Sequence, residues 1–358
     1  MLFEIADADV TARATAARGS DVLAVVFSQV RVPAGRFGLS RLFARTAHAC
    51  LFLNQPDNAW YRGAEAAVDA AIARAVDAVR PARVVLYGSS MGAWGALSAA
   101  ARRPDAEAVA FAPDFSVGEP GGRSAEAGLA PVDGEPDLSA LLAAPRRGTI
   151  DLVIGLYDPY DAGVAARLVD IGLPAAVRLS TVASGHEVHD HLYSLNVIRR
   201  VIAGFVRPIG AEAVAKGLAL PIGDTGRRHA LARLALDLGA GRTVDPAAVA
   251  AVAFSGDPGA ALVEAEALAA AGRIDEAERR LARLGVEIAA SPILSSLPKR
   301  FRKEVPRRRI ALLDALGRTD DARIVAAEAA AAFPTDDGFA ARAGFAPPDE
   351  VPGGADLT

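Results

Sequence analysis

Residues 83–95 have the sequence RVVLYGSSMGAWG. An apolar, β-branched run leads into the pattern Gly-x-Ser-x-Gly at residues 88–92, and a segment with helical periodicity follows. A serine on such a sharp strand-to-helix turn presents its hydroxyl above the end of a sheet, and the two glycines permit the tight backbone. The pattern predicts Ser90 as a nucleophile. The competing interpretation is an ordinary strand-to-helix turn that binds a phosphate or no ligand.

Short apolar runs of strand length recur on both sides of this turn. They lie at Asp21–Ser28, Ala49–Leu53, Ala82–Gly88, Ala106–Ala112, Ile150–Gly155 and Ala175–Val182. Segments with helical periodicity separate them, which predicts an α/β fold with a doubly wound, mainly parallel sheet and helices on both faces. The Gly- and Pro-rich stretch 113–147 interrupts the alternation and is expected to be an excursion over the sheet, a lid or cap.

The ends of the last two predicted strands supply candidates for an acid and a base. Asp158 lies three residues beyond Gly155, and Asp161 is its competitor, although either could simply cap a helix or a turn. A Gly-His pair follows the last strand and makes His186 the candidate base, with His189 in reserve.

Serine, acid and histidine thus follow predicted strands in the chain order of α/β-hydrolases, and residues 1–205 resemble that superfamily. The resemblance implies a Ser90–His186–Asp158 triad in which the carboxylate orients the imidazole and stabilises the imidazolium. It implies neither a cofactor nor a metal.

The same resemblance locates an oxyanion hole. Its donors would be the backbone N–H of Met91 and that of Gln29 or Val30, after the strand at 21–28. The sequence departs from the family here, because Ser28-Gln29 replaces the common His-Gly pair. The departure leaves the geometry of the hole and the substrate class open.

A loop rich in amides and aromatic rings follows the strand at 49–53. Candidate substrate-binding residues are Asn54, Asp57, Trp60 and Tyr61, with Ser89 beside the nucleophile. Such groups suit a polar, ring-shaped or glycosyl ligand, and the N-terminal pattern also resembles small bacterial hydrolases of surface-glycan pathways. The favoured interpretation is that the aromatic rings pack under the loop while the polar residues form turns.

A metal-dependent hydrolase fits the histidines less well than a serine enzyme. The sequence HEVHDH at residues 186–191 would need a histidine at Asp190 to match His-Glu-x-x-His. It would need one at Val188 to match His-x-His-x-Asp-His.

The sequence therefore predicts a serine hydrolase of carboxylic esters or thioesters. An acyltransferase with the same triad is the alternative, and a partner-binding scaffold is a second one.

The second part of the chain has a different composition. After a hydrolase domain over residues 1–206, a Pro/Gly-punctuated linker is expected at 207–224 and an all-helical region at 225–358, ending in a flexible tail. Gly272-Arg273-Ile274-Asp275-Glu276-Ala277 matches Gly317-Arg318-Thr319-Asp320-Asp321-Ala322 and predicts tetratricopeptide-like helical pairs for self-association or a protein partner.

Seven basic residues lie among the eleven at positions 299–309. Such a cluster could bind an acidic protein, a phospholipid or a phosphorylated carrier, but pairing with neighbouring acids on a solvated face is favoured.

The bulk composition limits the partners and the compartment. The 358 residues include 39 Lys and Arg against 43 Asp and Glu, a net charge of −4, so no general attraction to nucleic acid or an anionic membrane is expected. Cys50 is the single cysteine, and no apolar stretch approaches the ~18 residues of a membrane span. A small-molecule or glycan-linked ester substrate and a cytoplasmic location are expected.

Overall fold

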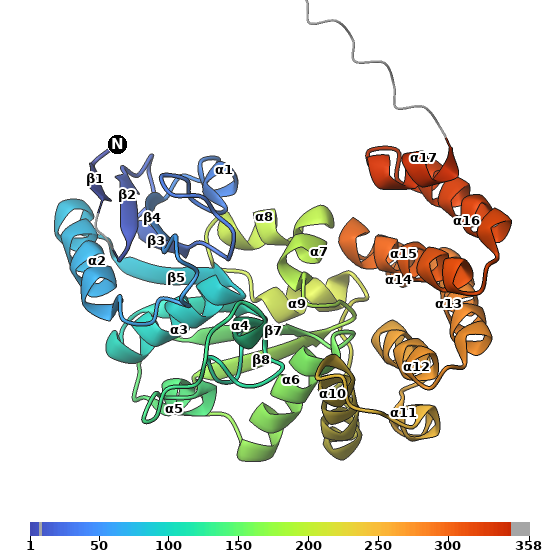
Figure 1. Cartoon of the computed structure of the whole chain (residues 1–358). Helices are drawn as coiled ribbons and strands as arrows, with labels where there is room; N and C mark the ends of the chain where they lie inside the picture. Colours follow the sequence, from blue (N-terminus) through green and yellow to red (C-terminus); the bar gives the residue numbers. More distant parts are fainter. Residues whose placement is uncertain (7–8, 345–358) are drawn as a thin grey trace, which may run out of the picture. The chain divides into compact units, whose positions relative to one another are not determined.

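The computed structural model describes residues 1–6 and 9–344 and divides the chain into two compact units, Met1–Gly241 and Arg242–Thr358 (Figure 1). The first unit continues past residue 206 and so includes the segment 207–224, which the sequence suggested as a linker. The later residues of the expected C-terminal tail, from 345 onward, lie outside the described residues.

Eight strands of the first unit form one sheet in the order β1-β2-β4-β3-β5-β6-β7-β8. Their bounds are β1 Phe3–Ala6, β2 Thr11–Thr15, β3 Val22–Phe27, β4 Ala49–Asn54, β5 Arg83–Ser89, β6 Glu107–Phe111, β7 Ile150–Gly155 and β8 Val177–Val182. Strands β3 to β8 are parallel to their neighbours in this group, whereas β2 is antiparallel to β1 and to β4. The prediction of a mainly parallel sheet is therefore confirmed.

Helices cover both faces of the sheet. They are α1 Ser40–Phe43, α2 Glu65–Val79, α3 Met91–Arg102, α4 Arg123–Glu126, α5 Leu138–Ala143, α6 Pro159–Ile171, α7 Val188–Ser194, α8 Val197–Ile202, α9 Ile209–Ala215 and α10 Thr225–Gly239. Alternate residues of a strand point to opposite faces. On β5, Leu86 joins the core formed with α2, α3 and α6, while Tyr87 contacts His189 of α7 from the other face.

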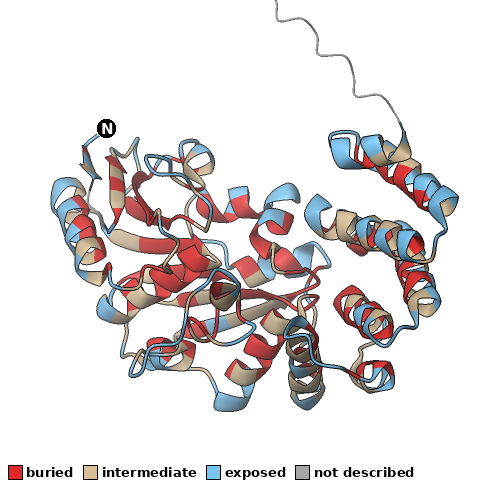
Figure 2. Ribbon diagram, in the orientation of Figure 1, coloured by how far each residue is buried: buried red, intermediate tan, exposed pale blue. Residues whose placement is uncertain are grey.

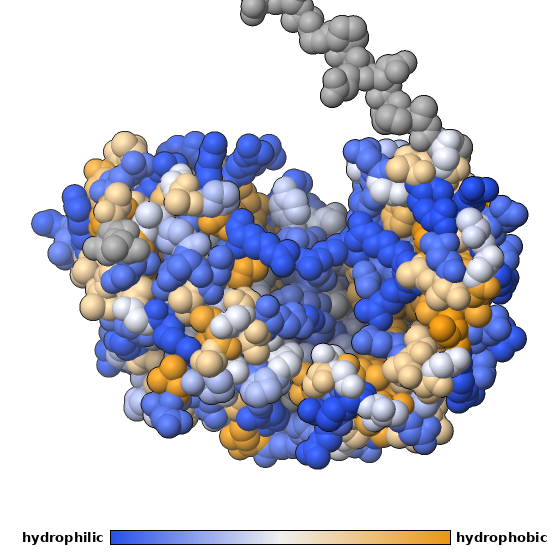
Figure 3. Space-filling view, in the orientation of Figure 1, coloured by the Kyte–Doolittle hydropathy of each residue, from blue (hydrophilic) through white to orange (hydrophobic). Residues whose placement is uncertain are grey.

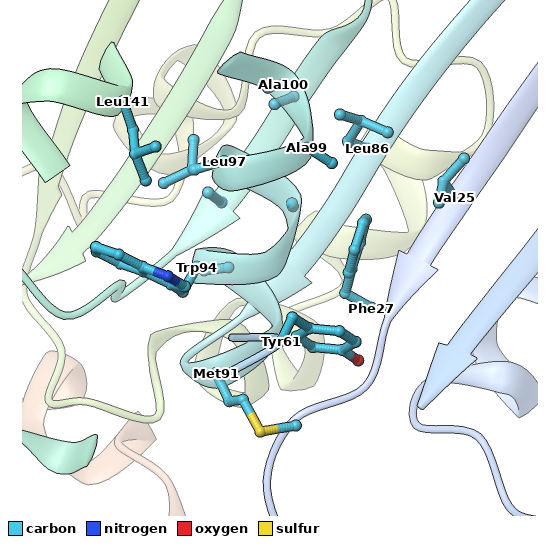
Figure 4. Close-up of a cluster of buried hydrophobic side chains, with 14 of the residues drawn as sticks. Val25, Phe27, Tyr61, Leu86, Met91, Trp94, Leu97, Ala99, Ala100 and Leu141 are labelled. Atoms are coloured by element: carbon cyan, nitrogen blue, oxygen red, sulfur yellow. The ribbon is translucent and has the colours of Figure 1, made fainter. Parts of the chain in front are cut away.

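Helix α3 lies in the middle of the core. Figure 2 shows buried residues along the central strands and on the helix sides that face them. Trp94 and Leu97 of α3 are buried near Leu141 of α5, and Leu86 of β5 lies beside the helix (Figure 4). Because α3 begins directly after Ser90, this packing fixes the position of the serine turn.

The excursion expected at 113–147 runs between β6 and β7 and contains α4 and α5. Its apolar residues, including Phe115 and Leu138, join the core. Arg62 ties it to the loop after β4, because the guanidinium pairs with Glu135 at 2.7 Å and donates to the carbonyl of Ala130 at 2.8 Å. A lid function of this segment stays a prediction.

The second unit is helical. Its helices are α11 Pro246–Val252, α12 Pro258–Ala270, α13 Ile274–Ala290, α14 Pro292–Ser296, α15 Lys299–Ala315, α16 Thr319–Ala332 and α17 Asp337–Ala343. The long helices pack on one another in chain order, with α12 on α13, α13 on α15 and α15 on α16. Short turns join α12 to α13 and α15 to α16, and α14 lies between α13 and α15. No helix in residues 1–6 and 9–344 is long and apolar enough to cross a membrane.

The two matching sequence segments form matching turns. Gly272 and Gly317 have φ angles of 75° and 71°, a left-handed conformation that favours glycine. The arginine after each glycine, Arg273 or Arg318, donates its N–H to the carbonyl five residues earlier at 2.9 Å. The internal repeat therefore corresponds to a repeated helix–turn–helix. Its tetratricopeptide-like character and its role in partner binding stay predictions.

Candidate active site

Ser90 lies between the end of β5 and the first residue of α3, with φ 55° and ψ −121°. Such angles are strained for a non-glycine residue, as in the serine turns of hydrolases. Its N–H donates to the carbonyl of Phe111 at 2.8 Å. A Cβ on Gly88 would lie 2.0 Å from the Gly92 carbonyl oxygen, and one on Gly92 would lie 2.5 Å from the Phe27 carbonyl oxygen. Only glycines at both positions allow this turn to close.

His186 comes from the loop between β8 and α7 and faces Ser90. Its Nε2 lies 3.1 Å from the Ser90 Oγ, within hydrogen-bond distance. The loop approaches the end of β7 closely, because a Cβ on Gly155 would lie 2.3 Å from the Gly185 carbonyl oxygen. The Tyr157 N–H also donates to the Ser184 carbonyl at 2.8 Å. These contacts bring the histidine to the serine from 96 residues away.

The carboxylate beside the imidazole belongs to Asp161, not to Asp158. The Nδ1 of His186 lies 2.9 Å from Oδ2 and 3.2 Å from Oδ1 of Asp161, which is 1% exposed. Asp158 instead begins α6 as its N-cap and accepts the Asp161 N–H at 3.0 Å. Its other oxygen pairs with Arg123 of α4. The side chain expected to orient the imidazole is thus used by the helix start and by an arginine.

Electrostatics distinguish the two carboxylates. Burial raises the pKa of Asp161 to about 6. Burial also raises the pKa of Asp158, but Arg123 and His186 outweigh it and the net pKa is below the ordinary value. For His186, burial lowers the pKa, but the charge and hydrogen bond of Asp161 outweigh it and raise the pKa to about 9. Asp161 therefore favours the imidazolium that forms when His186 takes a proton.

The excursion contributes a buried polar layer that the sequence did not indicate. Arg123 pairs with Asp158. Asp114 accepts the Ser124 N–H at 2.8 Å, and burial raises the pKa of the Asp114 carboxyl. Neither Arg123 nor Asp114 belongs to a motif, and both lie in the irregular stretch after β6. The one available signal was the change of composition at residue 113.

The expected oxyanion donors lie where two backbone segments meet. Met91 is the first residue of α3, so its N–H has no partner within the helix. Gln29 and Val30 follow the end of β3, which approaches α3 closely at Gly92. The end of β3 is held in turn by Ser28, whose Oγ accepts the Gly38 N–H at 2.9 Å.

The amide- and ring-rich loop after β4 faces inward. Asn54, Trp60 and Tyr61 are 0%, 1% and 3% exposed, and the polar groups of Asn54 and Tyr61 bind backbone carbonyls. These three side chains therefore support the loop and are closed to a substrate. Asp57 is exposed, and Ser89 is half-buried beside the nucleophile.

The other histidines of the HEVHDH segment point elsewhere. His189 Nε2 lies 2.9 Å from the Tyr87 hydroxyl, and His191 Nδ1 lies 3.0 Å from the Ser184 Oγ. Among the described residues, no three His, Cys, Asp or Glu side chains are grouped to hold a metal ion.

The basic cluster lies on α15, around which hydrophilic residues are prominent in Figure 3. Four of its side chains pair with acids, as Lys303 and Arg307 with Asp336, Arg308 with Glu266 and Glu304, and Arg309 with Glu278. These pairs favour the interpretation of a solvated, internally compensated face.

No family model and no curated protein matches the chain. Solved structures that resemble it include a glycosylation-associated protein complex from Streptococcus agalactiae, at 14% identity and a TM-score of 0.39 over 52% of this chain and 42% of that one. This chain thus covers less than half of the streptococcal protein.

Two further similar structures are covered almost completely. The capsule O-acetyltransferase of Neisseria meningitidis serogroup A is 11% identical, with a TM-score of 0.39 over 55% of this chain and 94% of that one. An α/β serine hydrolase homologue from Coxiella burnetii is 14% identical, with a TM-score of 0.39 over 57% and 96%. The sheet and the serine turn of the first unit form an α/β-hydrolase fold.

Proposed function

We propose that the chain cleaves carboxylic esters or thioesters through a Ser90–His186–Asp161 triad. The observation that carries the proposal is the continuous hydrogen-bonded path from the Ser90 Oγ through both nitrogens of His186 to a buried carboxylate. A strained serine, an imidazole and an acid in this order activate a hydroxyl for nucleophilic attack.

The Ser90 Oγ attacks the acyl carbonyl carbon while its proton moves to Nε2 of His186. The carbonyl oxygen becomes an oxyanion, for which the N–H groups of Met91 and Gln29 are the proposed donors. The imidazolium then protonates the leaving alcohol or thiol as the tetrahedral adduct collapses to an acyl-serine. A water or an acceptor hydroxyl, deprotonated by His186, attacks the acyl-serine. The bond from the acyl carbon to the Ser90 Oγ then breaks, the imidazolium returns its proton to the Oγ, and the carboxylic acid or the acylated acceptor leaves.

A fluorophosphonate probe tests the nucleophile on the full chain. The native protein should be labelled, and Ser90→Ala should not. Ser98→Ala serves as the matched control, because Ser98 lies on the same helix and its hydroxyl accepts a hydrogen bond from Arg102. Labelling that survives Ser90→Ala, or that disappears with Ser89→Ala alone, would refute the proposal.

Hydrolysis and acyl transfer share this acyl-serine, so the acceptor is tested by its products. With p-nitrophenyl acetate as the donor, nitrophenol release should match acetate release if water is the acceptor. A deficit of acetate in the presence of glycerol or a free sugar would indicate transfer to a hydroxyl.

A further inference from the structure

The loop after β4 combines a strained backbone with two deeply buried aromatic side chains. Asn58, Trp60 and Tyr61 have φ angles of 58°, 57° and 59°, in the left-handed region that non-glycine residues seldom adopt. For two bulky aromatic residues in succession, such a conformation persists only where the surrounding structure enforces it. Strain of this kind is often retained because a side chain must occupy one particular place.

Gln55 and Arg62 enforce the conformation from the two ends of the loop. The Gln55 side-chain carbonyl accepts the Tyr61 N–H, and its amide donates to the Arg62 carbonyl at 3.2 Å. Arg62 then binds the excursion through Glu135 and the carbonyl of Val117, at 2.7 and 3.1 Å. The backbone at Tyr61 is thus held from both sides.

The Tyr61 ring lies between the two segments that carry the proposed oxyanion donors. It meets the Phe27 ring of β3 edge-on, with centroids 5.2 Å apart (Figure 4). A Cβ on Gly95 of α3 would lie 2.5 Å from the Tyr61 Cδ2. The ring therefore packs against the end of β3 on one side and against α3 on the other.

The Tyr61 hydroxyl lies within hydrogen-bond distance of two backbone carbonyls. Its oxygen lies 3.1 Å from the carbonyl oxygen of Ser28 and 3.1 Å from that of Leu53. The Ser28 carbonyl belongs to the same planar peptide group as the N–H of Gln29, so a bond that fixes the oxygen also fixes the direction of the N–H. Burial raises the pKa of Tyr61, which keeps the phenol protonated and able to donate.

We propose that Tyr61 is a positioning residue of the oxyanion hole. Through its hydrogen bond to the Ser28 carbonyl, it orients and polarises the peptide whose N–H Gln29 offers to the oxyanion, and its ring holds that peptide beside the start of α3. A donor that is aligned before the reaction needs no reorganisation when charge develops. This inference rests on the proposed function. It assigns Tyr61 a role in the transition state without contact to substrate.

The test compares Tyr61→Phe with Tyr87→Phe in the full chain. Tyr87 is the matched control, because it is fully buried and its hydroxyl is hydrogen-bonded to His189 on the other face of the sheet. The substrates are p-nitrophenyl acetate and its thiono analogue, in which sulfur replaces the carbonyl oxygen. The sulfur accepts hydrogen bonds poorly, so damage to an oxyanion hole slows the oxoester more than the thionoester.

Loss of a whole oxyanion donor costs ~10²–10³ in kcat, and Tyr61 acts through a donor that remains. We expect Tyr61→Phe to lower kcat for the oxoester about tenfold, to leave KM nearly unchanged and to lower the oxoester-to-thionoester rate ratio about tenfold. Tyr87→Phe should leave that ratio unchanged. An unchanged ratio in Tyr61→Phe, including equal slowing of both substrates, would overturn the inference.

Gln55→Met provides a second test of the proposal if Tyr61→Phe does not fold. This variant removes the side-chain contacts that hold Tyr61 and retains the phenol, so the rate ratio should again fall, and an unchanged ratio counts against the inference. The proposed function fails separately, because it depends on fluorophosphonate labelling of Ser90, which the rate ratio does not measure.

Discussion

Replacing Asp161 with asparagine should disable the proposed triad while leaving the chain folded. The amide has nearly the same shape, but it removes the negative charge 2.9 Å from Nδ1 of His186. The pKa of His186, about 9 instead of the ordinary 6.5, corresponds to ~3 kcal/mol in favour of the imidazolium. Losing that amount from the transition state slows turnover ~10²-fold. An amide that also favours the wrong imidazole tautomer can extend the loss to ~10⁴-fold, as in serine proteases.

Asp158→Asn is the matched control, three residues earlier at the same helix start. Asparagine is a good N-cap and can still accept the Asp161 N–H, so turnover should stay within about tenfold of the native rate. The assay is kcat for p-nitrophenyl acetate, with circular dichroism to confirm folding. A severe loss in Asp158→Asn together with a mild one in Asp161→Asn would refute the assignment, and two mild losses would exclude both carboxylates.

Further predictions concern pH, truncation and the half-buried Arg123. His186 must be neutral to act as a base, so kcat/KM should fall as the pH drops through the raised pKa of His186, with a midpoint near 9. A midpoint at or below 6.5 in the pH profile would contradict this. A chain ending at Gly241 should be monodisperse in light scattering, whereas one ending at Arg207 should aggregate because it lacks the helix that covers α6. Arg123→Met leaves the carboxylate of Asp158 without this arginine. The free energy of unfolding, measured in urea, should fall by about 1–3 kcal/mol. No change would show that the pair is not stabilising.

The central strands were predictable because each is a continuous apolar run. All six predicted runs correspond to strands β3 to β8. Strands β3 and β4 are buried throughout, whereas β8, at the edge of the sheet, is only partly buried. The two strands at the β1 end of the sheet, β1 and β2, were not predicted. β2 has the sequence TARAT, in which only the two alanines are buried, and β1 is a four-residue strand with exposed positions. Short, half-exposed strands carry little hydrophobic signal, and the pairing of β2 with β4 and of β1 with β2 is a tertiary effect.

Within the candidate site, local motifs singled out Ser90 and His186, which the structure brings together, but not the carboxylate that lies beside His186. Asp158 and Asp161 are both close to the end of β7, and spacing alone cannot separate them. Asp158-Pro159 is, however, a helix-start signature, with an N-cap acid followed by proline at the first helical position. A carboxylate committed to capping is less available to an imidazole, so this signal favoured Asp161. The contact with Arg123 depends on the course of the excursion, which the sequence did not indicate.

The first compact unit ends at Gly241, beyond the linker at 207–224 that the composition suggested. Helix α10 is rich in Ala, Leu and Arg, like the helices of the second unit, and it follows a Pro/Gly-punctuated segment. Yet a Cβ on Gly163 of α6 would lie 2.7 Å from the Ala232 side chain of α10. Arg228, 2% exposed, donates to the carbonyls of Leu156 and Ile222 at 3.2 and 3.1 Å. Leu156 directly follows β7, and α6 begins with the turn that carries Asp161. Helix α10 therefore supports the element that holds the acid, and the smallest unit expected to retain the chemistry ends after this helix.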